Sequence, residues 1–172
     1  MPKPGKPVPD GCHTMTPYLT CRDASKAIEF YKKAFGAQEV MRATGPDGKT
    51  IMHANLKIGD GNVFLCEEQL EWGAKSPLTL GGTGSSIYLT VPDCDAVFNS
   101  AVAAGATVKQ PLADMFWGDR WGSLVDPFGH SWQVATHKFD LTPERVIYSV
   151  AELNAVAGAG HVDRPPDYRR PG

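Results

Sequence analysis

The stretch Tyr18-Leu19-Thr20-Cys21-Arg22-Asp23 returns later in the chain as Tyr88-Leu89-Thr90-Val91-Pro92-Asp93. A helical stretch follows each copy and closes on a related tripeptide, Phe35-Gly36-Ala37 in the first and Ala104-Gly105-Ala106 in the second. A unit of this size, with one strand and one helix at its start, cannot bury its apolar face alone, whereas two packed copies can. The repeat therefore predicts two related modules that share a core and enclose a cleft.

The first module, residues 12–70, is predicted to form one strand, one helix and three antiparallel strands. Alternating apolar and polar residues predict the strands over 13–21, 37–41, 51–58 and 62–67. Segment 22–25 offers helix-capping side chains, and apolar residues then recur at helical spacing up to Phe35. Gly36 ends the helix, because a residue without Cβ adopts the left-handed conformation without strain. The module therefore has the order βαβββ.

The second module, residues 85–140, repeats that order. We predict strands over 86–91, 106–110 and 130–137, an aromatic segment over 116–125, and a helix over 97–104 with Asp93 as its N-cap. Asp126-Pro127-Phe128-Gly129 is a turn sequence before the last strand. Residues 71–84 connect the modules and contain Trp72, Pro77 and several glycines, which is typical of a long loop that borders a site.

The two ends of the chain differ from the modules. Residues 1–11 are rich in Pro, Lys and Gly and are expected to run extended over the surface. Residues 141–157 resemble a C-terminal helix that begins at Thr142 and Pro143. One apolar stripe on that helix is typical of a docking face and comprises Val146, Ile147, Val150 and Leu153. We expect residues 158–172 to form a flexible tail.

The composition limits the classes of function. The 172 residues carry a formal net charge of −2, and Lys and Arg are scattered, so the chain has no basic patch typical of nucleic-acid binding. The composition is that of an ordinary globular protein and indicates no membrane segment. The four cysteines have no paired metal-binding spacing, and the first residues lack the charged-then-apolar pattern of a secretory segment. We therefore expect a cytoplasmic protein with reduced thiols and a small-molecule partner.

Two tandem βαβββ units, with Ala27-Ile28-Glu29-Phe30-Tyr31 in the first helix and Asp126-Pro127-Phe128-Gly129-His130 in the last hairpin, resemble the vicinal oxygen chelate superfamily. This superfamily includes glyoxalase I, bleomycin-resistance proteins and extradiol dioxygenases. The chain is most similar to the PhnB-like branch, on the segments Thr16-Pro17-Tyr18-Leu19, Met52-His53-Ala54, Phe116-Trp117-Gly118-Asp119-Arg120 and Ala135-Thr136-His137. The resemblance spans about residues 11–144. It implies an α+β fold of paired βαβββ modules whose sheets form a cup, and a homodimer, but it names no substrate.

Metal-dependent members of this superfamily take ligands from the first and last strand of each module. Matching the family pattern to this sequence places those four positions on Thr16, Leu65, Ser86 and Gln133. Such enzymes need imidazole and carboxylate donors, whereas hydroxyls and an amide bind divalent ions weakly and a leucine offers no donor. We therefore predict that the inherited metal site is absent and that no cofactor is bound, with a divalent metal as the alternative.

Several side chains are candidates for lining the cup. By alternation along their strands, Tyr18 and Tyr88 share one face with Thr16 and Ser86. His53 is either a half-exposed strand residue or a ligand contact able to transfer protons. The aromatic residues near loops and strand ends favour a ligand wall, although some of them would equally fill the core or a dimer interface. The predicted ligand-binding residues are Tyr18, His53, Tyr88, Trp117, Trp121 and Gln133.

Four further residues near the end of the second module are expected to have other roles. His137 ends the last strand on the face of Gln133, where it could reach the rim of the cup. His130 follows a turn glycine and is expected to make a structural contact in the hairpin. Asp119 and Arg120 are expected to form an ion pair or a turn contact that shapes their loop.

Two functions from different classes fit these patterns. The first is a metal-free binding module that holds an apolar or aromatic small molecule, for example to sequester a toxic compound. The second is an enzyme, which would use either a displaced metal or acid–base chemistry of His53 with Tyr18 or Tyr88. A displaced metal would be held by His53, Glu67 or His137. Whether the modules pair within one chain or across two stays open.

Overall fold

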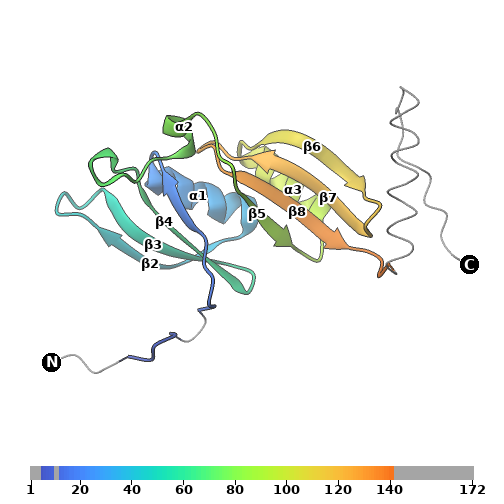
Figure 1. Ribbon diagram of the computed structural model, residues 1–172, viewed down its shortest axis with the longest axis horizontal. Helices are drawn as coiled ribbons and strands as arrows, with labels where there is room; N and C mark the ends of the chain where they lie inside the picture. The colour runs from blue at the N-terminus through green and yellow to red at the C-terminus, as the bar shows by residue number, and fades with distance from the viewer. Residues whose placement is uncertain (1–4, 10–11, 142–172) are drawn as a thin grey trace, which may run out of the picture.

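The computed structural model describes residues 5–9 and 12–141. Figure 1 shows two four-stranded sheets side by side, each with one long helix packed against it. The first sheet is built by the first repeat and the second sheet by the second, which confirms the predicted α+β fold of tandem βαβββ units. None of the helices in the described residues is long and apolar enough to cross a membrane.

The elements follow the predicted order. The first module contains β1 (Tyr18–Cys21), α1 (Ala24–Phe35), β2 (Gln38–Thr44), β3 (Ile51–Ile58) and β4 (Gly61–Glu67). The connection contains a 3-10 turn, η1 (Leu70–Trp72), and a short helix, α2 (Pro77–Leu80). The second module contains β5 (Ser86–Thr90), α3 (Cys94–Ala104), β6 (Thr107–Asp114), β7 (Asp119–Val125) and β8 (Ser131–His137).

Both sheets have the same topology, with the strand orders β1-β4-β3-β2 and β5-β8-β7-β6. Neighbouring strands are antiparallel, except that the first strand of each module lies parallel to its last strand. The register repeats as well, since Tyr18 lies opposite Phe64 and Tyr88 lies opposite Gln133. β1 and β5 each end their sheet, so within the described residues each leaves one strand edge without a neighbouring strand.

Several predicted elements have different bounds in the structure, and β2 and β6 extend to Thr44 and Asp114. β1 begins at Tyr18 rather than at residue 13, and α3 begins at Cys94 rather than at residue 97. The segment predicted as a loop contains η1 and α2, because Ser76 caps α2 through its hydroxyl and is itself held by the Glu68 carboxylate, 2.7 Å from Ser76 N. The predicted C-terminal helix and tail lie outside the described residues, apart from Leu141.

Both long helices are fixed at their ends by residues that the repeat shares. Asp23 and Asp93 each accept a hydrogen bond from a backbone amide in the first helical turn. Gly36 and Gly105 end the two helices with φ angles of 64° and 116°, a region that disfavours residues with a Cβ. The N-cap predicted at Asp93 and the stop predicted at Gly36 are therefore confirmed.

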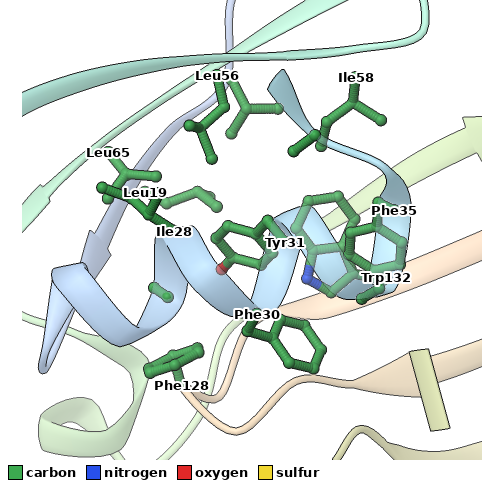
Figure 2. Packing of buried hydrophobic residues seen from close by; sticks show 14 of the residues in the cluster. Leu19, Ile28, Phe30, Tyr31, Phe35, Leu56, Ile58, Leu65, Phe128 and Trp132 are labelled. Carbon is green, nitrogen blue, oxygen red and sulfur yellow. The ribbon is translucent and has the colours of Figure 1, made fainter. Parts of the chain in front are cut away.

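One hydrophobic core runs through both modules, because α1 and α3 pack against each other. Trp132 of β8 is fully buried, and its ring centroid lies 4.4 Å from that of Phe35 and 5.3 Å from that of Tyr31, both on α1 (Figure 2). Phe128 of the last hairpin packs edge-on against Phe30 at 6.0 Å. Aromatic residues of the second module thus pack directly on the helix of the first.

A buried carboxylate joins the two modules. Asp126 is 4% exposed, and its Oδ2 accepts hydrogen bonds from Tyr31 Oη at 2.7 Å and from Trp132 Nε1 at 2.9 Å. Its Oδ1 accepts two backbone amides of its own turn, each at 2.9 Å. His130 Nε2 lies 3.1 Å from the carbonyl oxygen of Thr20, so the structural contact expected of this histidine crosses from one module to the other. The buried carboxylate of Asp126 therefore accepts four hydrogen bonds, two on each oxygen.

Candidate functional site

Each sheet turns one face to its helix and leaves the other face open. On β3, Ala54, Leu56 and Ile58 are buried on the helix side, whereas His53 is half-buried and Lys57 is exposed on the opposite side. The alternation predicted for this strand is therefore confirmed. The side chains that the sequence singles out for ligand binding belong to these open faces or to the turn that precedes β7.

On the first sheet, three strands bring a phenol, an imidazole and a phenyl ring together. Tyr18 Oη of β1 lies 2.9 Å from His53 Nδ1 of β3. The ring centroid of Phe64, on β4 between them, lies 6.0 Å from that of Tyr18 and 5.0 Å from that of His53. Partial burial, and then the neighbouring Cys66 thiol, raise the pKa of Tyr18. This pair can exchange a proton with a ligand, which is the minimum that acid–base chemistry requires.

On the second sheet, the Asp119 carboxylate is the centre of a hydrogen-bonded group. Its Oδ2 accepts from Tyr88 Oη at 3.0 Å and from Trp117 Nε1 at 3.1 Å, and its Oδ1 lies 2.7 Å from His137 Nδ1. Burial, and then the bond to Asp119, raise the pKa of Tyr88 to about 12. The Asp119 and Asp140 carboxylates on its two ring nitrogens raise the pKa of His137. The predicted position of His137 on the open face is consistent with these contacts.

Two indoles and an amide extend this group across the second sheet. Trp121 Nε1 donates to Gln133 Oε1 at 3.0 Å, and Gln133 Nε2 donates to Ser86 Oγ at 2.6 Å. The rings of Trp117 and Trp121 meet edge to face with centroids 5.8 Å apart. Phe116 in turn packs edge-on against Trp117 at 4.9 Å. The aromatic wall predicted near residues 116–121 is therefore a connected surface on the second sheet.

The expected ion pair between Asp119 and Arg120 is wrong. Arg120 binds Asp95 of α3 through two hydrogen bonds of 2.6 and 2.7 Å and lies 3.3 Å from Asp114. Adjacent residues of a strand point to opposite faces of the sheet, which sends Arg120 to the helix side and Asp119 to the open side. The same alternation, read from the sequence, would have placed Asp119 among the candidate site residues.

The six predicted ligand-binding residues fall into two groups on two sheets. Tyr18 and His53 contact each other on the first sheet, while Tyr88, Trp117, Trp121 and Gln133 belong to the second. Among the described residues, no hydrogen bond or ring contact joins the two groups. The physical reason is that the helix sides of the modules meet at the centre of the chain. A shared site would need both open faces to be brought together.

The positions matched to metal ligands do not fit a divalent ion. Leu65 is fully buried in the core, and the repeated register makes Phe64 the counterpart of Gln133, so the match on Leu65 is wrong by one residue. The corrected set still offers only a phenyl ring, hydroxyls and an amide, which lack the imidazole and carboxylate donors of such sites. Across residues 5–9 and 12–141, no three His, Cys, Asp or Glu side chains are grouped to hold a metal.

Glu67, one of the residues considered for a displaced metal, has a structural role. Its two carboxylate oxygens accept the backbone amides of Asp23 at 2.7 Å and Ala24 at 2.8 Å. Those amides are at the start of α1, where the unpaired N–H groups and the helix dipole favour a negative charge. The carboxylate is therefore committed to the N-terminus of the helix. Of the residues considered for a displaced metal, His53 and His137 remain, and they lie on different sheets.

Two clefts lie outside the open faces. One, of about 590 Å³, lies between the modules and is lined by Phe35, by residues 58–61 and by residues 88–93. The β5 edge that has no neighbouring strand borders it, and Tyr88 is the one predicted ligand-binding residue in its wall. The other, of about 550 Å³, lies on the first module beside the start of α1, with Arg42 and Glu67 in its lining.

Comparison with known proteins identifies the family. Residues 12–134 match the model of the Glyoxalase/Bleomycin resistance protein/Dioxygenase superfamily. The chain belongs to this superfamily. An uncharacterized protein of Mycobacterium bovis is 50% identical over 123 residues, covering 70% of this chain and 80% of that protein. An uncharacterized protein of Arabidopsis thaliana is 31% identical over 128 residues, covering 69% and 74%.

Solved structures of other proteins share the fold. TioX from Micromonospora sp. ML1 is 29% identical with a TM-score of 0.57, over 76% of this chain and all of TioX (100%). A PhnB protein from Bacillus cereus is 21% identical with a TM-score of 0.57, over 72% of this chain and 99% of that one. The superfamily predicted from the sequence is thereby confirmed, and the PhnB protein shares its fold.

Proposed function

We propose that this member of the superfamily binds an apolar or aromatic small molecule on its open sheet faces without a metal ion. The observation that carries the proposal is the chemistry of the four positions discussed above, Thr16, Phe64, Ser86 and Gln133. None of them offers a charged or imidazole donor. Ser86 and Gln133 are already hydrogen-bonded to each other, because Gln133 Nε2 donates to Ser86 Oγ at 2.6 Å. The surrounding surface is rich in indole and phenol rings, which suit a flat or apolar ligand.

We further propose that the working form is a homodimer in which the first sheet of one chain faces the second sheet of its partner. In the part of the chain that the structure describes, β1 and β5 each have one edge without a neighbouring strand, and the cleft of about 590 Å³ beside β5 leaves room for added chain. Strand edges of this kind bind a further strand through their backbone groups. A two-fold dimer pairs β1 of each chain with β5 of the other. The four unpaired cysteines fit a reducing, cytoplasmic location.

The metal-free part of the proposal is tested by elemental analysis of protein purified without chelator, together with thermal-shift titrations using nickel, zinc, manganese and iron(II). We expect no stoichiometric ion and no rise in the melting temperature of the wild type, since only an ion that binds the native state stabilises it. The double variant Ser86→His with Gln133→Glu serves as the positive control. It places an imidazole beside a carboxylate, and its melting temperature should rise with added nickel or zinc. A stoichiometric ion in the wild type would contradict the proposal.

The dimer is tested by sedimentation velocity and by hydrogen exchange of β1 and β5 at several protein concentrations. We expect a dimer, with amide protection along both strands that falls on dilution while protection of the interior strand β4 stays constant. A chain that is monomeric at all concentrations would contradict this arrangement. Protection of β1 and β5 that is independent of concentration would also contradict it.

A second candidate function is an acid–base enzyme, and one contact favours it. Tyr18 Oη and His53 Nδ1 are 2.9 Å apart on the open face, so the pair can hold and pass a proton. Ligands identified by binding should be recovered and analysed by mass spectrometry after long incubation with the protein. Unchanged ligand supports the binding module. Altered ligand, with conversion lost in His53→Gln and retained in the control variant His13→Gln, supports the enzyme.

A further inference from the structure

We infer that the open face of the second sheet recognises a planar ligand that carries a positive charge, such as a quaternary or protonated aromatic amine. This inference rests on the proposed small-molecule binding and adds the chemical class of the ligand. It concerns the aromatic acidic face, which we define as Tyr88, Trp117, Asp119, Trp121 and Gln133.

The polar edges of all three aromatic rings are already used within the protein. Tyr88 and Trp117 donate to the same oxygen of Asp119, at 3.0 and 3.1 Å, and Trp121 donates to Gln133 at 3.0 Å. A ligand therefore finds no free hydrogen-bond donor on these rings and meets their π faces instead. The π face of an indole or phenol is electron-rich, and it binds cations and stacks with flat rings.

The charge of this face is negative. The side chain of Asp119 is 18% exposed, and among the described residues no lysine or arginine forms an ion pair with it. The nearest guanidinium along the chain, that of Arg120, is held on the helix side by Asp95 and Asp114. The residue that can balance Asp119 is His137, whose Nδ1 lies 2.7 Å from Asp119 and whose Nε2 lies 2.9 Å from Asp140. The two carboxylates of Asp119 and Asp140 outnumber this single imidazole, so the formal charge beside the rings is negative whether or not His137 carries a proton.

The first sheet lacks this combination, which makes it the internal contrast. The group around Tyr18 consists of a phenol, a phenyl ring, a thiol and an imidazole, and no carboxylate contacts Tyr18 or His53 among the described residues. A cation gains more on the second sheet, because the charge of Asp119 there adds to the cation–π attraction of the rings.

The inference is tested by measuring dissociation constants of three probes of matched size by equilibrium dialysis against the full chain. The probes are N-methylquinolinium as the cation, methylnaphthalene as its neutral counterpart and naphthoate as the anion. We expect the cation to bind about tenfold more tightly than the neutral probe, the size of a partly desolvated cation–π contact. The anion should bind most weakly. The Asp119→Asn variant should keep only the smaller part of this preference that the rings provide, because the charge is removed while the rings remain. The control Asp95→Asn, on the opposite face, should keep the full preference.

The possible outcomes distinguish the preference for a cation from small-molecule binding itself. If the neutral probe binds as tightly as the cation, the charge preference is wrong and small-molecule binding stands. If no probe binds, both fail. A preference of undiminished size in Asp119→Asn would also overturn the inference. Should that variant fail to fold, Trp121→Leu replaces it, because it keeps the carboxylate but removes a ring, and the cation's affinity should fall toward that of the neutral probe.

Discussion

The two modules share a framework and differ on the surface that this framework presents. Tyr18 and Tyr88 occupy the same register position, and both helices end at a left-handed glycine. On the open faces, however, the first sheet groups neutral rings around His53, while the second groups indoles around the Asp119 carboxylate. The helix side is constrained by one shared core, whereas the open side carries no such constraint. Repetition therefore preserves the fold and leaves the residues of the open faces free to differ.

The two modules use different side chains to fix the start of their long helix to the last strand. In the first module, Glu67 accepts the amides of Asp23 and Ala24 at the start of α1. In the second, Thr136 occupies the equivalent place on β8, and its hydroxyl accepts Cys94 N at 2.8 Å and donates to Val91 O at 2.9 Å. Both side chains fix the first turn of a helix to the last strand. The position is thus structural in both copies, although one of them is a carboxylate.

The largest expected effect is on the shared core. Trp132→Ala removes a fully buried side chain of the second module that packs on α1 of the first, and it should cost about 3–5 kcal/mol of unfolding free energy. Urea unfolding followed by circular dichroism measures this loss. Because the core is common, both modules should still unfold in one transition. Two separate transitions would contradict a core shared by both modules. Trp72→Ala, at an exposed position, is the control and should have little effect on stability.

The next effect concerns the bond between the modules. Tyr31→Phe removes the hydroxyl that donates to Asp126 at 2.7 Å and leaves a buried carboxylate one donor short. The expected loss is about 1–3 kcal/mol, the range for a buried group deprived of a partner. Chemical denaturation of the variant and of Tyr88→Phe, whose hydroxyl binds Asp119 on the open face, compares a buried phenol with an exposed one. Equal losses in the two variants would contradict the assigned roles.

A smaller effect is expected at the helix caps. Glu67→Ala leaves the two amides at the start of α1 without their carboxylate and should cost about 1–2 kcal/mol, as for other N-terminal caps. Thermal unfolding is the measurement. Glu29→Ala, on the exposed side of the same helix, should change stability by no more than about 0.5 kcal/mol. If Glu67 were instead a ligand-binding residue, its removal would leave stability unchanged.

The smallest effect is the pH dependence from His137. Its pKa is raised above the ordinary value of 6.5 by Asp119 and Asp140, so the native state holds the proton more tightly than the unfolded state. The contribution to stability is complete below about pH 6.5 and is lost as the pH rises through the native pKa. Melting temperatures of the wild type and of His137→Gln should therefore converge at higher pH. A difference that grows as the pH rises would contradict the assignment.

The sequence predicts the framework well because its signals are local. The alternation over residues 51–58 and the stop at Gly36 depend on backbone geometry, and both agree with the structure. The role of Asp119 and the position of Leu65 were missed, because they depend on which face of a strand a residue occupies and on strand register. The sequence places Tyr18 and Tyr88 in separate modules and leaves open whether these pair within one chain. That the two groups do not meet within the described residues follows from how α1 and α3 pack, which no single segment of the sequence encodes.

Native mass spectrometry of the full chain with N-methylquinolinium tests the central claim most directly, because one spectrum reports chain number, bound metal and bound ligand. Our account predicts a dimer with no divalent ion and up to two cations bound, one for each aromatic acidic face. The Asp119→Asn dimer should lose most of the bound cation and keep its subunit number. A monomer that binds the cation fully, or a dimer with one tightly held divalent ion per chain, would contradict the account.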